Sequence, residues 1–211
     1  MRKIFFATLL VLMMSIQICG AATIDSAKFN GNDKLVYPVV SLSNRDVAQK
    51  INAAIVAEVD RFLTGVYRNA QTNNYTVADV RTSFEVGSNE SGGTVILSLV
   101  LTESCYYAGA AHPATIKTAL NFNVGTGDLM GIDYLTDIGE GVSVDELRGR
   151  VERALISHCK RENLYLFEEA VPLKNLPENF YWDANLHVHF IFQHYDVAPY
   201  AAGIIDVDID A

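Results

Sequence analysis

The stretch that decides the fold is residues 94–129, TVILSLVLTESCYYAGAAHPATIKTALNFNVGTGDL. Residues 94–107 predict a strand, and their VILSLVL centre is apolar on both faces, which is typical of the middle of a sheet. Residues 115–124 alternate apolar and polar side chains and predict a neighbouring strand. Gly125 and Gly127 then favour a tight turn, because glycine adopts positive φ without steric cost. This order predicts an antiparallel sheet built from hairpins.

The residues on the N-terminal side extend this arrangement. Residues 75–86 form a long β-branched run and predict a further strand of the same antiparallel meander. Residues 44–70 predict an amphipathic helix that is broken at Asn73 and Asn74, and residues 34–42 predict a strand before it. The apolar side chains at helical spacing are Val47, Ile51, Ile55, Val59 and Phe62.

The C-terminal part repeats the same kinds of element. Residues 143–163 predict a second helix, with Ser143 and Glu146 in the pattern of a capping box. Residues 180–182 and 186–192 predict a hairpin. The inward stripe of the helix is expected to contain Leu147, Val151, Ala154, Leu155 and His158. A closing strand is predicted from Ile205, Val207 and Ile209 on one face and Asp206, Asp208 and Asp210 on the other.

The predicted order is strand, helix, three strands, helix, three strands. Hairpin-connected strands with separate helices indicate an α+β fold with mostly antiparallel sheet and two main helices. The pattern nearly repeats, which divides the chain into residues 23–110 and residues 111–211. We expect the two halves to pack as one compact unit.

The first residues predict a secretory signal. Arg2 and Lys3 are followed by an apolar segment, residues 4–16, which is too short to span a bilayer, and then by small residues up to Ala22. We expect cleavage after Ala22, which leaves no membrane span and places the protein outside the bacterial cytoplasm, in the periplasm or at the cell surface. Lipidation of Cys19 and an uncleaved anchor are the alternatives.

The charge balance restricts the class of partner. The chain has 25 acidic and 16 basic side chains and a formal net charge of −9. Nucleic acids and anionic membranes are disfavoured as partners, because phosphate binding needs concentrated Lys and Arg. A cationic partner would be attracted over long range. Solubility alone is the alternative explanation for the acidic charge.

Two cysteines, Cys105 and Cys159, remain after signal cleavage. In an oxidising compartment an isolated pair can form a disulfide, so these two are disulfide candidates. Two buried thiols are the alternative.

The five histidines give few candidates for chemistry. His187 and His189 lie on one face of a strand as a candidate metal pair, but a zinc site needs three or four ligands, so exposed histidines without metal are the better interpretation. His158 belongs to the core stripe. His112 lies on a loop, where functional residues concentrate. Ser104 is close to it in sequence, but no nucleophile elbow surrounds that serine. We predict no catalytic constellation, no metal and no cofactor.

Four tyrosines flank the two loops rich in Gly, Ala and Pro, at residues 106–113 and 193–203. Tyrosine provides contact area at low entropic cost, and it also closes cores with its hydroxyl at the rim, so both roles stay open. The candidate ligand-binding residues are Tyr106, Tyr107, His112, Tyr195 and Tyr200.

Two segments carry a family resemblance. Residues 106–135, YYAGAAHPATIKTALNFNVGTGDLMGIDYL, resemble the signature of the bacterial extracytoplasmic domain DUF3298. Residues 179–209, NFYWDANLHVHFIFQHYDVAPYAAGIIDVDI, look like its closing part. Residues 34–105 are similar to the DUF4163 domain that usually precedes it. Ala110 replaces a usual glycine, and Asn123 replaces a usual aspartate, so no acid role is carried over to position 123.

The resemblance implies a function. Better-known members of this family include the extracellular part of an anti-sigma factor that binds lysozyme and the non-catalytic front part of a peptidoglycan deacetylase. It therefore implies a secreted, non-enzymatic binding module of the bacterial cell envelope, whose partner is a cationic lysozyme-type muramidase or peptidoglycan. A peptidoglycan hydrolase that uses His112 with a nearby carboxylate and a structural envelope protein are the alternatives.

Overall fold

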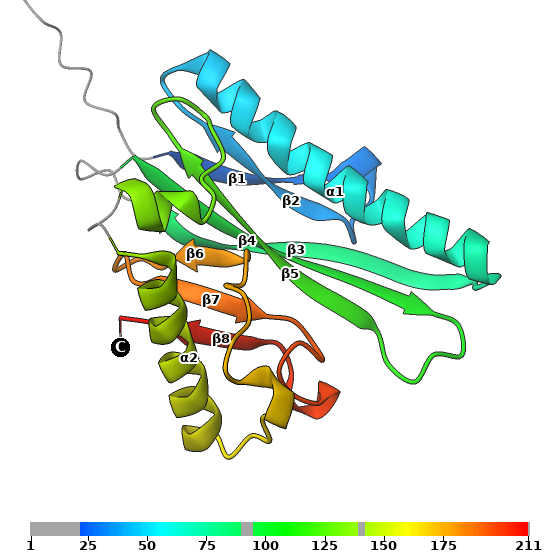
Figure 1. The fold of residues 1–211 in the computed structure, drawn as a ribbon. Helices are drawn as coiled ribbons and strands as arrows, with labels where there is room; N and C mark the ends of the chain where they lie inside the picture. Colours follow the sequence, from blue (N-terminus) through cyan, green and yellow to red (C-terminus); the bar gives the residue numbers. More distant parts are fainter. Residues whose placement is uncertain (1–21, 90–94, 139–141, 211) are drawn as a thin grey trace, which may run out of the picture.

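The structure is a computed structural model that describes residues 22–89, 95–138 and 142–210 (Figure 1). The segment with Arg2, Lys3 and Cys19 lies outside the described residues, so the signal peptide stays a prediction. The fold is α+β with antiparallel sheets and two main helices, as predicted. No helix within the described ranges has the length and apolar character needed to cross a membrane.

The helices are α1 (Arg45–Asn73) and α2 (Val144–Arg161). The strands are β1 (Thr23–Lys28), β2 (Val36–Ser41), β3 (Val77–Asn89), β4 (Ile96–Tyr107), β5 (Ala114–Asn123), β6 (Phe180–Trp182), β7 (Val188–Phe192) and β8 (Ile205–Asp208). Short helical turns lie at Phe29–Gly31, Tyr134–Ile138, Glu168–Ala170 and Tyr200–Ala202.

The strands form three antiparallel sheets, in the orders β1-β2, β3-β4-β5 and β6-β7-β8. Strand β4 is central in the second sheet, as its two apolar faces predict. Strand β1 was not predicted. Four of its six side chains are exposed, and only Ile24 and Ala27 are partly buried, so its sequence lacks the alternation that identifies a half-buried strand.

The sequence determines both ends of α1 locally. The Asn44 side chain accepts hydrogen bonds from the backbone N–H groups of Asp46 and Val47 at the start of the helix. At the other end Asn74 adopts the left-handed conformation, with φ of 55°. The buried face includes Ile51, Ile55 and Val59, which are completely inaccessible to solvent.

Helix α2 also begins as predicted. The Ser143 hydroxyl accepts a hydrogen bond from the Glu146 N–H at 3.2 Å. Its buried side chains recur at every fourth residue, which adds Cys159 to the predicted stripe and leaves Ala154 and His158 half-buried at the edge. The buried residues are Leu147, Val151, Leu155 and Cys159.

The molecule contains two hydrophobic cores. The first lies among α1 and β1 to β5 and ends at Val124, whereas the second begins at Met130 and lies among α2 and β6 to β8 (Figure 1). Strand β5, which the sequence places in the second half, packs in the first core because it pairs along its whole length with β4. The cores therefore divide between residues 125 and 129.

Amide side chains join the two cores. The Asn179 side chain accepts from the Ala119 N–H at 2.8 Å and donates to the Lys117 carbonyl at 2.7 Å. The Gln193 side chain accepts from the Lys117 N–H at 3.0 Å and donates to the same carbonyl. These bonds satisfy backbone groups of Lys117 and Ala119 on the outer edge of β5, where exposed polar groups would attract another strand.

Candidate functional site

The loops at residues 106–113 and 193–203 meet at one end of the molecule. The Tyr200 ring stacks on the His112 ring with a centroid distance of 3.6 Å and on the His194 ring at 4.2 Å. Because both stacks are this close, the two histidine rings lie on opposite faces of the Tyr200 ring. Tyr195 lies beside them, with its centroid 5.9 Å from that of Tyr200. We call His112, His194, Tyr195 and Tyr200 the ring surface.

Hydrogen bonds to one short segment hold the two loops together. The Tyr200 hydroxyl donates to the Pro113 carbonyl at 3.1 Å, and His112 Nδ1 lies 3.0 Å from the same oxygen. His194 Nδ1 lies 3.3 Å from the Thr115 carbonyl oxygen. A carbonyl only accepts hydrogen bonds, so both histidines carry their proton on Nδ1 in these contacts. The ring arrangement is thus fixed from both loops.

The structure separates the predicted tyrosines. Tyr195 is 59% exposed and has a φ of 69°. The Tyr106 hydroxyl donates to the Ala110 carbonyl within the first loop. The Tyr107 hydroxyl instead donates to Val66 of α1 and accepts from Asn69. Successive strand residues point to opposite faces, so Tyr107 lies away from the ring surface.

A hollow of about 430 Å³ lies beside His112. Its lining contains Asp79, Arg81, Ser104, Tyr106, Ala111, His112 and Pro113. The Ser104 hydroxyl lies 3.0 Å from that of Thr115, and the Asp79 carboxylate bonds Lys34 and Arg81. Within the described ranges, neither the serine nor a carboxylate is hydrogen-bonded to His112.

His187 and His189 each pair with an aspartate across the β7–β8 ladder. His187 Nδ1 lies 3.0 Å from Asp208 Oδ2, and His189 Nδ1 lies 2.8 Å from Asp206 Oδ1. Both pairs are diagonal, because His189 stands directly opposite Asp208 in the register. The hydrogen bond to the aspartate raises the pKa of each histidine, against the opposing effect of burial.

Tyr181 completes this cluster. Its hydroxyl donates to Asp206 at 2.9 Å, and its ring stacks on His189 with a centroid distance of 4.8 Å. Burial and the Asp206 charge raise the pKa of Tyr181 well above its ordinary value. Among the residues that the structure describes, no group of three or more His, Cys, Asp or Glu could hold a metal ion. The sequence identified the histidines but not their aspartate partners.

Cys105 and Cys159 are free, buried thiols. Cys105 lies in the first core and Cys159 in the second. The structure therefore contains two separate thiols, which was the alternative to a disulfide. Burial raises the pKa of both thiols, which favours their protonated form.

One carboxyl group is fully buried in the first core. Glu103 of β4 has no exposed surface, and one of its oxygens accepts from the Thr118 hydroxyl at 3.0 Å. Its other oxygen, Oε1, has no hydrogen-bond partner within the described ranges. Burial raises the pKa of Glu103 to about 7, and the charge of Glu58 contributes, against the opposing effects of Thr118 and Arg61. No local sequence pattern identified this group, because Glu103 follows the apolar centre of its strand among polar residues.

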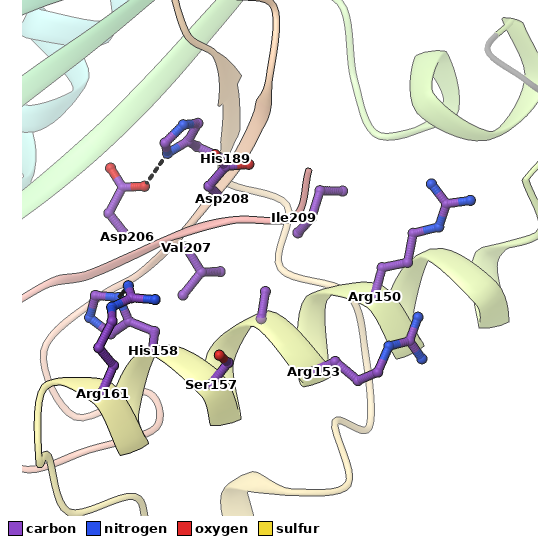
Figure 2. A pocket seen from close by; sticks show the side chains of 11 residues that line it. Arg150, Arg153, Ser157, His158, Arg161, His189, Asp206, Val207, Asp208 and Ile209 are labelled. Carbon is purple, nitrogen blue, oxygen red and sulfur yellow. Dashed lines mark hydrogen bonds and ion pairs between the residues drawn. The ribbon is translucent and has the colours of Figure 1, made fainter. Parts of the chain in front are cut away.

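A groove of about 730 Å³ runs between β8 and α2 (Figure 2). We call it the β8 groove. The strand contributes Asp206, Val207, Asp208 and Ile209 to its lining, and His189 of β7 also borders it. The helix contributes Arg150, Arg153, Ala154, Ser157, His158 and Arg161.

Comparisons with known proteins agree on one family. The model of DUF3298, a family described as protein of unknown function, matches residues 146–211. A solved member of the DUF3298 family from Bacteroides fragilis is similar at 16% identity and a TM-score of 0.50, over 89% of this chain and 87% of that one. A DUF3298 family protein from Pseudomonas aeruginosa is similar at 13% identity and a TM-score of 0.53, over 89% and 88%. No curated protein matches this chain.

These findings confirm the DUF3298 resemblance for the C-terminal part of the chain. The matched range includes residues 179–209, whereas residues 106–135 lie outside it. The two solved structures extend the similarity in fold to most of the chain, and at these identities they establish the fold alone. The similarity of residues 34–105 to DUF4163 stays a prediction.

Proposed function

We propose that this chain is a secreted, non-enzymatic binding module of the bacterial cell envelope, and that the ring surface is its contact surface. The observation that carries the proposal is the stack of Tyr200 on His112 and His194, which brings together two loops from distant parts of the sequence. Rigid aromatic side chains make strong contact points, because little conformational entropy is lost when they bind.

The proposed partner is a cationic protein of the lysozyme type. The net charge of −9 supports this choice, since opposite net charges accelerate encounter at low ionic strength. Exposed Tyr195 and Asp196 lie next to each other at the rim of the ring surface. They offer one apolar and one anionic contact to such a partner. Peptidoglycan is the alternative ligand at the same surface.

Calorimetric titration of the mature chain with a basic lysozyme tests the proposal. Binding is expected at low ionic strength and should weaken steadily as salt is added. Tyr195→Ala should reduce the affinity at least tenfold, about 1.4 kcal/mol, as expected for an aromatic contact residue. Tyr67→Ala is the matched control, because Tyr67 is similarly exposed, at 55%, on α1.

Two results would contradict the proposal. The first is an absence of lysozyme binding at low ionic strength together with an absence of sedimentation with purified peptidoglycan. The second is turnover of muropeptides that is lost in His112→Ala, which would favour the hydrolase alternative instead.

A further inference from the structure

Strand β8 is an open edge of its sheet. It pairs only with β7 among the described strands (Figure 1). The Ile209 N–H donates to the Val188 carbonyl at 3.0 Å, so Val207 faces Phe190 as the next hydrogen-bonded pair of the ladder. The backbone N–H and C=O groups of Asp206 and Asp208 therefore point away from β7. Such outward groups are a template for one more strand.

The β8 groove lies along this edge. Asp206, Val207, Asp208 and Ile209 all border it, so there is open space next to this part of β8. Figure 2 places Val207 on the side of β8 nearer to α2 and Asp206 on the other side, next to His189. An extended peptide that pairs with β8 would thus lie beside α2.

The α2 wall of the groove is cationic, although the protein as a whole has an acidic net charge. Arg150, Arg153, Ser157 and Arg161 recur at spacings of three and four residues and share one helix face. Arg150 pairs with Glu146, and Arg161 pairs with Glu162. Both are surface ion pairs, which contribute little to stability. Arg153 is exposed and has no ion-pair partner within the described ranges. A carboxylate in the groove would meet guanidinium groups suited to bind it.

A second copy of this chain is a poor occupant. Two β8 strands side by side would bring the Asp206 and Asp208 carboxylates of both copies onto one face, and like charges directly opposite are destabilising. In the single chain His189 and His187 lie within hydrogen-bond distance of these carboxylates. The edge is therefore protected against self-pairing but open to a different strand.

From this arrangement we infer that the β8 groove binds an extended polypeptide segment with Asp or Glu at alternate positions, which adds to the sheet as a strand next to β8. The backbone groups of Asp206 and Asp208 give the pairing, and the arginines of α2 select the acidic side chains on one face of the segment. This site is separate from the ring surface, and it does not depend on the function proposed there.

The probe is a labelled, end-blocked peptide of seven residues that alternates glutamate and valine. Its binding is measured by fluorescence anisotropy at low ionic strength. The same peptide with lysine in place of glutamate should bind at least tenfold more weakly. Arg153→Glu should reduce binding of the acidic peptide at least tenfold. Arg148→Glu is the matched control, because it makes the same charge change on the opposite face of α2. The affinity of this variant for the acidic peptide should stay within twofold of the wild type.

Strand addition is tested separately from charge. Methylation of alternate backbone nitrogens on the peptide edge that faces β8 should abolish binding, whereas methylation on the other edge should preserve it. Hydrogen exchange of the Asp206 and Asp208 amides should slow when the peptide is bound. Equal binding of the two methylated peptides, unchanged exchange at these amides, no binding of the acidic peptide, or dimerisation through β8 would each overturn the inference.

Discussion

Glu103→Gln should make the protein more stable at neutral pH and should remove part of its pH dependence. Glu103 is fully buried, and the pKa of its carboxyl group is raised from 4.5 to about 7, chiefly by burial. In the unfolded chain the group ionises at its ordinary pKa. The folded state therefore binds a proton that the unfolded state has released, over the range between these two pKa values.

The direction and the size of the change in the free energy of unfolding follow from this difference in pKa. A pKa raised in the folded state means that the free energy of unfolding falls as pH rises above 4.5. Each unit of pKa difference corresponds to about 1.4 kcal/mol, so the loss reaches about 3 kcal/mol at pH 7 and above. Glutamine is neutral at every pH and nearly isosteric. Glu103→Gln should thus match the wild type near pH 4.5 and exceed it by up to about 3 kcal/mol at pH 7.5.

Urea unfolding at pH 4.5, 5.5, 6.5 and 7.5 measures this difference. Other groups titrate over the same range, but their contribution cancels when the variant is compared with the wild type at each pH. Glu169→Gln is the control, because Glu169 is exposed and its variant should follow the wild type throughout. A constant difference across the series, or a less stable Glu103→Gln protein at pH 7.5, would refute the reasoning.

Four further predictions concern other parts of the molecule. His189→Gln should destabilise the protein in urea unfolding at pH 6 but not at pH 9, because the raised pKa of His189 gives stability that is lost as pH rises through it; an equal effect at both values would contradict this. Gly87→Ala should lower the free energy of unfolding by about 1–3 kcal/mol, since a Cβ there would collide with the Trp182 carbonyl and lie 2.8 Å from the Tyr181 ring; an unchanged thermal midpoint would count against that packing. Asn179→Ala should lower the free energy of unfolding by about 1–3 kcal/mol in urea unfolding, because it removes the partner of the Ala119 N–H, whereas the Lys117 carbonyl keeps its bond from Gln193. Thiol titration of the mature protein in denaturant without reductant should find Cys105 and Cys159 both reactive, and a missing pair of thiols would restore the disulfide.

Local patterns predicted most of the elements. The apolar periodicity of α1 and α2 and the capping residue Ser143 were readable because each depends on residues within one or two turns. The apolar run of β4 likewise indicated a central strand. Strand β1 was missed because most of its side chains are exposed, so burial does not shape its sequence.

Long-range pairing was harder to predict. The aspartates of β8 read as a solvated face, and only the β7–β8 register brings them to the histidines at positions 187 and 189. A His-x-His strand next to an Asp-x-Asp strand was the available signal. The loop at residues 108–113 resembles a boundary between halves, yet β5 after it returns to the first sheet, and no local pattern indicates this. The stack on Tyr200 likewise depends on tertiary contacts that no local pattern encodes.

The central claim is that residues 106–113 and 193–203 form one contact surface for a cationic partner. Mapping of backbone amide shifts by nuclear magnetic resonance, during titration of the labelled chain with a basic lysozyme at low salt, tests it most directly. Shifts should concentrate in these two loops and leave the exposed face of α1 around Tyr67 unchanged. Shifts confined to other surfaces, or no shifts at all, would contradict the claim.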